Sequence, residues 1–151
     1  MKDLIIEKLY EMSQKPYQRY FKKGQPWQIT RQQLIWFPQD TLGFHLGCFL
    51  LKYDFQLQSK LEDHDVFHVL TNTGITVPEE IDMQFFLLGN GKRSLYLFMV
   101  VVTGACLYPT HLKSFTSYYK RGKTTYRIYD LPFGEMLYQP IHNIRSQFNI
   151  Q

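Results

Sequence analysis

Two histidines lie four residues apart in the segment His64-Asp65-Val66-Phe67-His68. Residues at this spacing share one face of a helix, about 6 Å apart along its axis, so two imidazoles can converge on one ion. Metal-binding HExxH helices use the same geometry, with Glu at the position of Asp65. Asp65 could bind the ion directly, or it could orient one of the histidines without contacting the ion itself.

Glu80 is the candidate for a further ligand, because it follows His68 by a short connection. Thr76 and Glu79 have the spacing of a capping box, which occupies Glu79 and leaves Glu80 able to point elsewhere. The connection is short enough to fold the second helix back beside the first. The predicted metal ligands, which are also the predicted catalytic residues, are therefore His64, Asp65, His68 and Glu80.

These ligand types suit zinc, and they also suit iron(II) or manganese, because two His and one carboxylate form the facial triad of non-haem iron enzymes. No cysteine lies close by in sequence, which favours a site with an open position over a closed structural site. Two alternatives remain. The histidines could pack on a helix face without metal, or the chain could be an HD-type metal phosphohydrolase that pairs His45 with His64-Asp65 and an acid such as Asp130.

The elements that position these residues are predicted to be helices. A helix over 63–71 carries the histidines and stops at Asn72 and Gly74, which tolerate left-handed backbone. The next helix follows Thr76, has Pro78 in its first turn and runs to about residue 88. The other predicted helices span residues 3–13, 31–36 after Thr30, 41 to about 61 after Asp40, 92–118 with a kink or break at Pro109, and 135–148 bent at Pro140, with a basic turn at 120–123.

The composition fits one globular all-α domain over residues 1–151. Apolar residues make up 44% of the chain and aromatic residues 17%, and the excess of Phe and Tyr needs a core or an apolar lipid pocket. The run from Leu95 to Tyr108 is shorter than the roughly 20 residues that span a bilayer, so it is expected to form a core element or a pocket wall. Cys48 and Cys106 lie in apolar stretches and are expected to be buried thiols.

The segment 15–29 interleaves basic and aromatic residues. It is either a solvated loop or a membrane-surface patch, with aromatic rings at the level of the headgroups and cations facing anionic lipid. The net charge of +4 permits anionic partners. A nucleic-acid partner is not expected, because the basic residues do not continue into a long stripe.

The sequence resembles the Coq-four family of ubiquinone-biosynthesis proteins, found in mitochondria and many bacteria. The family's HDxxH-x11-E metal motif is matched without a gap from His64 to Glu80. Residues 37–43, 68–71 and 135–145 resemble the entry to the preceding helix, the continuation of the motif and the C-terminal helix. The resemblance covers roughly residues 30–150. At two positions where the family usually has Gly, this chain has Asn72 and Glu79, and neither change removes a ligand.

The resemblance implies an all-α fold and a divalent ion, usually taken as zinc, on the four motif residues. It implies a prenylated quinone precursor or related isoprenoid lipid in an apolar channel, beside Phe98 and Met99. It also implies a place on the cytoplasmic face of a bacterial membrane or the matrix face of a mitochondrial one, beside other coenzyme Q proteins. The implied activity removes the ring carboxyl of a polyprenylated benzoate and hydroxylates the same carbon, with His45 or His142 as a proton carrier. A non-enzymatic lipid-binding scaffold remains an alternative, and a homodimer remains open.

Overall fold

The structure is a computed structural model that describes Leu4, Lys8, residues 26–58 and residues 62–151. Within these residues the regular structure is helical, as predicted, and strand pairing is limited to one bridge between Thr41 and Pro140. The predicted helix over 3–13 and most of the basic-aromatic segment 15–29 lie outside the described residues.

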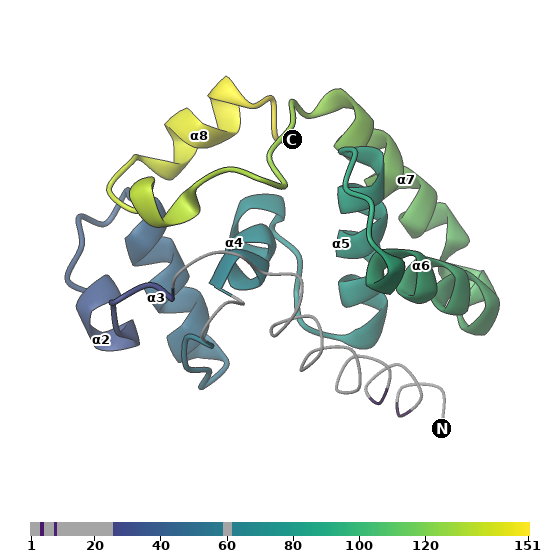
Figure 1. Cartoon of the computed structure of the whole chain (residues 1–151), viewed down its shortest axis with the longest axis horizontal. Coiled ribbons are helices and arrows are strands. Elements are labelled where there is room, and N and C mark those ends of the chain that lie inside the picture. The colour runs from purple at the N-terminus through teal and green to yellow at the C-terminus, as the bar shows by residue number, and fades with distance from the viewer. Residues whose placement is uncertain (1–3, 5–7, 9–25, 59–61) are drawn as a thin grey trace.

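The helices surround α4, which lies near the middle of the molecule (Figure 1). One side holds α2, α3 and α8, and the other holds α5, α6 and α7. Their bounds are α2 Arg31–Leu34, α3 Leu42–Lys52, α4 Glu62–Thr71, α5 Val77–Gly89, α6 Leu95–Leu107, α7 Leu112–Thr124 and α8 Ile141–Gln147, with short 3-10 helices η1 at Pro109–His111 and η2 at Phe133–Glu135. Buried apolar side chains from both sides form one main core around Val66, Phe67 and Phe86.

The helix predicted from residue 41 to about 61 is shorter than expected. Thr41, not Asp40, caps its start, because the Thr41 hydroxyl accepts a hydrogen bond from the Phe44 amide. α3 ends at Lys52, and Asp54 then adopts a left-handed backbone with φ of 54°. The Arg31 guanidinium of α2 donates to the Asp54 carboxylate and to the Phe55 carbonyl, which holds the chain in this turn. Residues 55–58 therefore leave the helix.

The two helices that carry the motif agree with the prediction. α4 begins at Glu62 and ends at Thr71, and Asn72 is left-handed with φ of 55°. Before α5, the Thr76 amide and hydroxyl both donate to Glu79 Oε2, at 3.0 and 2.6 Å. The capping box therefore does occupy Glu79, as the spacing of the two residues predicts.

The later helices differ from the prediction in three places. The predicted helix 92–118 is two helices, α6 and α7, and the segments on either side of Pro109 meet at 101°. The expected basic turn at 120–123 is the last turn of α7. The expected helix 135–148 begins only at Ile141. Pro140 lies directly before its first residue and therefore does not bend it.

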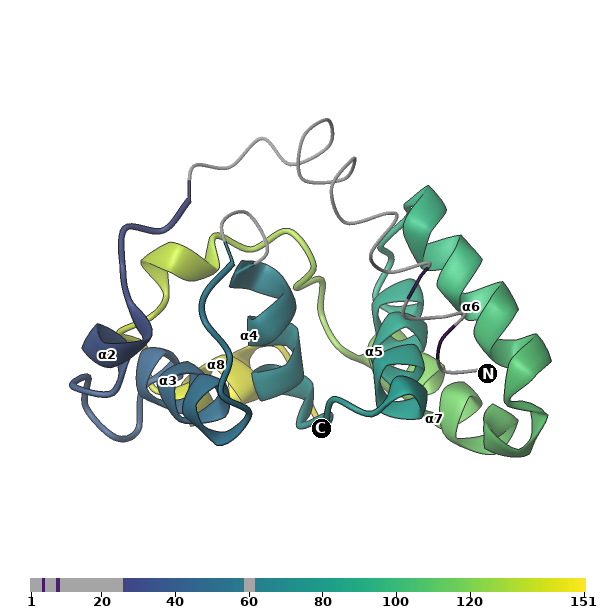
Figure 2. The same cartoon turned by 90° about the horizontal axis from the view of Figure 1, so that it is seen from below.

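One expectation about burial is wrong. Cys48 and Cys106 are exposed, not buried. Helix α6 lies at one end of the molecule (Figure 2), and its residues Phe98 and Met99, which the resemblance places beside a lipid channel, are exposed. Within the described residues, no single helix has the length and hydropathy to cross a membrane, although Leu95–Leu107 together with Pro109–Thr124 would pass on length and composition as a bent pair.

We expect Gly122→Ala to destabilise the fold, because a Cβ at Gly122 would lie only 2.0 Å from the Phe86 carbonyl oxygen of α5. Within a helix, alanine is normally more stabilising than glycine by about 1 kcal/mol. A net loss of about 1–3 kcal/mol in the free energy of unfolding would therefore report the cost of pushing α5 and α7 apart. Urea denaturation measures the change. Ser117→Ala, on the exposed face of the same helix, is the control and should change stability by less than about 0.5 kcal/mol. Equal stability of Gly122→Ala and wild type would contradict this packing.

Candidate metal centre

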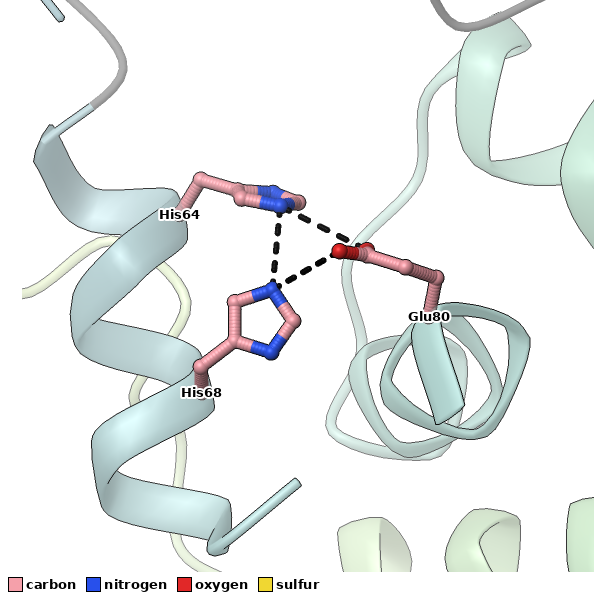
Figure 3. A group of neighbouring side chains, drawn as sticks. All are labelled: His64, His68 and Glu80. Atoms are coloured by element: carbon pink, nitrogen blue, oxygen red, sulfur yellow. Dashed lines mark hydrogen bonds and ion pairs between the residues drawn. The ribbon is translucent and has the colours of Figure 1, made fainter. Parts of the chain in front are cut away.

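The imidazoles of His64 and His68 lie one turn apart on α4 and point toward α5, where Glu80 meets them (Figure 3). The two Nε2 atoms are 3.2 Å apart. Glu80 reaches both rings, with Oε1 at 3.0 Å from His68 Nε2 and Oε2 at 3.4 Å from His64 Nε2. The i, i+4 spacing and the fold-back of α5 therefore bring three of the four predicted ligands together.

In the described part of the chain, these three form the one group of His, Cys, Asp or Glu residues whose potential ligand atoms all lie within 4.8 Å of one another. Two imidazole nitrogens and one carboxylate fit zinc or iron(II), which accept this set with a position left open. The donor set and its convergence therefore fit a divalent ion.

Glu80 is the electrostatic centre of the group. Burial alone would raise the pKa of Glu80, but the charge and hydrogen bonds of His64 and His68 outweigh it and lower the pKa well below its usual value. Burial would likewise lower the pKa of His68, but the hydrogen bond and charge of Glu80 reverse this and raise it. The group thus attracts positive charge, which can be supplied by protons or by a metal ion.

Asp65 is not one of the converging residues, but it lines the same cavity. Burial raises its pKa to about 6, and the carboxylates of Glu80 and Glu62 act in the same direction, while His64 and His68 oppose them. A carboxyl group with a pKa near 6 can exchange a proton at neutral pH. Asp65 therefore lines the cavity as a group that can exchange protons, and its predicted role as a fourth ligand stays a prediction.

A cavity of about 200 Å³ opens over the three residues. Its remaining walls come from the segment after α3 and from the loop before α5, namely Phe55, Gln56, Gln58 and Ile75, together with Asp65. A cavity of about 150 Å³ is enough to hold benzene, so this one has room for a substituted ring but not for a long isoprenoid tail. The early end of α3 supplies part of this wall.

Neighbouring elements hold α4 in place. Arg145 of α8 donates to the carbonyls of Val69 and Leu70, at 2.9 and 3.3 Å, and Arg121 of α7 donates to the carbonyl of Thr71. These donors satisfy carbonyls at the end of the helix that have no partner within it. The position of the histidines therefore depends on α7 and α8 as well as on α4.

The residues of the phosphohydrolase alternative do not join the group. His45 is exposed on α3 and lines a second cavity, of about 430 Å³, together with Lys52 and Arg145; of the three converging residues, only His68 also lines this cavity. Asp130 pairs with Arg127 near the surface. His142, the other proposed proton carrier, is exposed on α8. The cavity above Glu80 is lined by none of these three residues.

Sequence reasoning missed several residues around the centre. Phe49 of α3 stacks on the His68 ring, with ring centroids 5.4 Å apart and planes 17° apart. Thr73 contacts the other side of the His68 imidazole, at Nδ1. For Thr73, its position one residue beyond the left-handed Asn72 could have given a signal, whereas the contact of Phe49 depends on how α3 packs and has no local signature.

The fold is shared with a protein of known structure. The comparison covers all of this chain and 82% of a crystal structure from Nostoc punctiforme PCC 73102, a protein assigned to ubiquinone biosynthesis by its name, with a TM-score of 0.72 and 18% identity. At this identity the likeness shows the fold alone. No protein-family model matches the chain, and no curated protein matches its sequence.

We expect Asp65→Asn to stabilise the metal-free protein at alkaline pH. The folded pKa of about 6 lies above the usual 3.8, so the folded state binds the proton more tightly and loses stability as pH rises from about 4 through 6. Asparagine removes this cost, which corresponds to about 3 kcal/mol for a pKa raised from 3.8 to about 6. Urea denaturation in the presence of a chelator should show this gain at pH 8 and little gain at pH 4. Asp40→Asn, at an exposed position, is the control. The same gain at both pH values would show that the Asp65 charge is not the cause.

Proposed function

We propose that this protein binds a divalent metal ion through His64, His68 and Glu80 and acts on a polyprenylated benzoate or quinone precursor. The observation that carries the proposal is the convergence of two imidazoles and one carboxylate at a cavity with room for a ring. The motif resemblance to the Coq-four family supports the choice of substrate. The name of the solved protein that shares the fold points to the same pathway.

The reaction that we propose removes the ring carboxyl as carbon dioxide and places a hydroxyl on the same carbon. This change releases two electrons, so it needs an oxidant such as dioxygen. A bound divalent ion would supply Lewis acidity toward the substrate's carboxylate. Zinc has no redox chemistry, whereas two His and one carboxylate are also the ligands of non-haem iron(II) oxygenases. The oxidative reaction therefore favours iron(II) as the active ion.

The chain's own residues would hold the substrate and move its proton. His64, His68 and Glu80 would place the ion at the floor of the cavity, while Phe55 and Ile75 would pack against the ring. Asp65 would give or take a proton, since its pKa of about 6 lies close to neutral pH. The isoprenoid tail would extend outside the cavity, because about 200 Å³ cannot contain it.

A membrane surface is the partner that we propose for α6. Its exposed apolar residues lie at i, i+3, i+4 and i+7 on one face, and they are Leu95, Phe98, Met99 and Val102, of which Leu95 is 77% and Val102 62% exposed. No charged residue lies within α6, and the exposed cations Arg93 and Lys113 lie beyond its two ends. An apolar face between cations suits an anionic lipid surface, where a tail leaving the cavity would also be soluble.

The metal proposal predicts that the purified protein takes up one equivalent of zinc or iron(II), measured by elemental analysis after dialysis. Glu80→Gln should lose most of this binding, because the amide cannot supply the negative charge that the two imidazoles face. Asp130→Asn, which tests the phosphohydrolase alternative, should bind as wild type does. Loss of binding in Asp130→Asn with retention in Glu80→Gln would favour that alternative.

The same preparations test catalysis. With a short-chain prenylated 4-hydroxybenzoate labelled in its carboxyl group, the iron(II)-loaded protein in air should release labelled carbon dioxide, and Glu80→Gln should not. Metal binding without release, under every metal and redox condition, would favour the non-enzymatic scaffold.

The membrane proposal predicts that the protein floats with vesicles of phosphatidylcholine and phosphatidylglycerol. Val102→Asp should weaken this binding about tenfold or more, because it places a charge in the apolar face of α6; tenfold corresponds to 1.4 kcal/mol. The control is Trp36→Asp, which adds the same charge at an aromatic residue that is 85% exposed outside α6. Equal binding of both variants and the wild type would exclude α6 as the contact.

A further inference from the structure

A chain of three hydrogen bonds runs from His68 away from the metal centre. His68 Nδ1 lies 3.3 Å from the Thr73 hydroxyl, which lies 3.0 Å from the Thr71 hydroxyl. The Thr71 hydroxyl donates to the Phe67 carbonyl at 2.6 Å. His68, Thr71 and Thr73 are all buried, although His68 and Thr73 also line the cavity of about 430 Å³. The chain ends on a carbonyl oxygen, which can only accept.

Counting protons gives this chain a direction. A threonine hydroxyl has one proton, and Thr71 gives its proton to the Phe67 carbonyl. The bond between the two hydroxyls must then be donated by Thr73. Because the proton of Thr73 is used in that bond, its contact with His68 must be donated by the imidazole, from Nδ1–H.

This direction determines whether the other ring nitrogen of His68, Nε2, carries a proton or a lone pair. A neutral imidazole with its proton on Nδ1 has a lone pair on Nε2. Nε2 is the atom that faces Glu80 Oε1 at 3.0 Å and His64 Nε2 at 3.2 Å. A lone pair directed at a carboxylate is repelled by it unless a cation lies between them or a neighbouring N–H, such as Nε2–H of His64, donates to the lone pair.

We propose that Thr71 and Thr73 are positioning residues that hold His68 in the Nδ1–H tautomer and so present its Nε2 lone pair to the metal ion. This inference rests on the proposed metal-binding function and deepens it. In many metal sites a carboxylate or a backbone carbonyl accepts the proton of the second ring nitrogen. Here two hydroxyls accept this proton in sequence and end on a backbone carbonyl, and a backbone hydrogen bond of Thr73 also favours the protonated ring.

The backbone explains why this relay is available. The left-handed turn at Asn72 brings the chain back over the end of α4, so that the Thr73 amide donates to the His68 carbonyl at 3.1 Å. The same turn places the Thr73 hydroxyl against the ring. Phe49 stacks on the ring face, so both the plane and the tautomer of His68 are held.

The first test replaces the hydroxyl that contacts the ring. Thr73→Val keeps the shape of the side chain, and we expect it to weaken zinc binding by about 10–100-fold in titrations against a competing chelator. Thr73→Ser should restore binding. Thr116→Val, at an exposed threonine of α7, is the matched control and should bind as wild type does.

The second test reads the tautomer directly, by ¹⁵N NMR of the metal-free protein at alkaline pH. We expect Nδ1–H for His68 in the wild type. Thr71→Ala leaves Thr73 against the ring but frees its proton, so Nε2–H should become populated; Thr71→Ser should behave as wild type. A purely structural role for Thr71 would leave the tautomer unchanged in Thr71→Ala.

The outcomes separate this inference from the proposed function. If the wild type binds zinc and Thr73→Val binds equally well with an unchanged tautomer, the relay is wrong and the metal site stands. If the wild type binds no metal, the proposed function fails, and the tautomers of the wild type and Thr71→Ala still decide on the relay. If Thr73→Val does not fold, the Thr71 variants carry the test.

Discussion

A half-buried carboxylate that faces two imidazoles is the interaction on which the candidate metal centre of this protein depends. Burial alone would raise the pKa of Glu80, and the charge and hydrogen bonds of His64 and His68 lower it, so these two contacts favour the ionised carboxylate. The same contact joins α4, near the middle of the molecule, to α5 on one side of it. Positive charge at this point, whether from protons or from a metal ion, is what allows those helices to meet through polar side chains.

The ends of helices shape this centre more than their middles do. α3 ends early at the Arg31–Asp54 pair and so releases residues 55–58 to form a cavity wall. The end of α4 is held by Arg145 and continues into the turn that returns Thr73 to His68. Each of these ends combines a local backbone conformation with a partner that is distant in sequence.

Helices α5 and α7 pack tightly against each other, whereas α6 leaves one apolar face exposed. α5 and α7 approach so closely that Gly89 and Gly122 leave no space for a side chain. α6, by contrast, keeps one apolar face outward while its other face packs onto the core through Leu97 and Val101. A similar fold in a protein assigned to ubiquinone biosynthesis shows that the architecture recurs at 18% identity. Since one fold can host many chemistries, function has to be argued from the centre itself.

The sequence by itself determined the features that depend on near neighbours. The i, i+4 spacing of His64 and His68, the capping box at Thr76 and the left-handed Asn72 are local signals, so α4, α5 and the meeting with Glu80 were predictable. Only the tertiary structure decided where α3 ends and that Gly122 lies in a helix and not in a turn. It also decided that Asp65 is not one of the converging side chains, and that Thr71 and Thr73 connect His68 to a carbonyl. The end of α3 and the close approach at Gly122 arise from contacts between residues far apart in sequence, which leave no periodicity for the sequence to show. The contacts of Thr71 and Thr73 with His68 are local, but they depend on side-chain conformations that the spacing of residues does not specify.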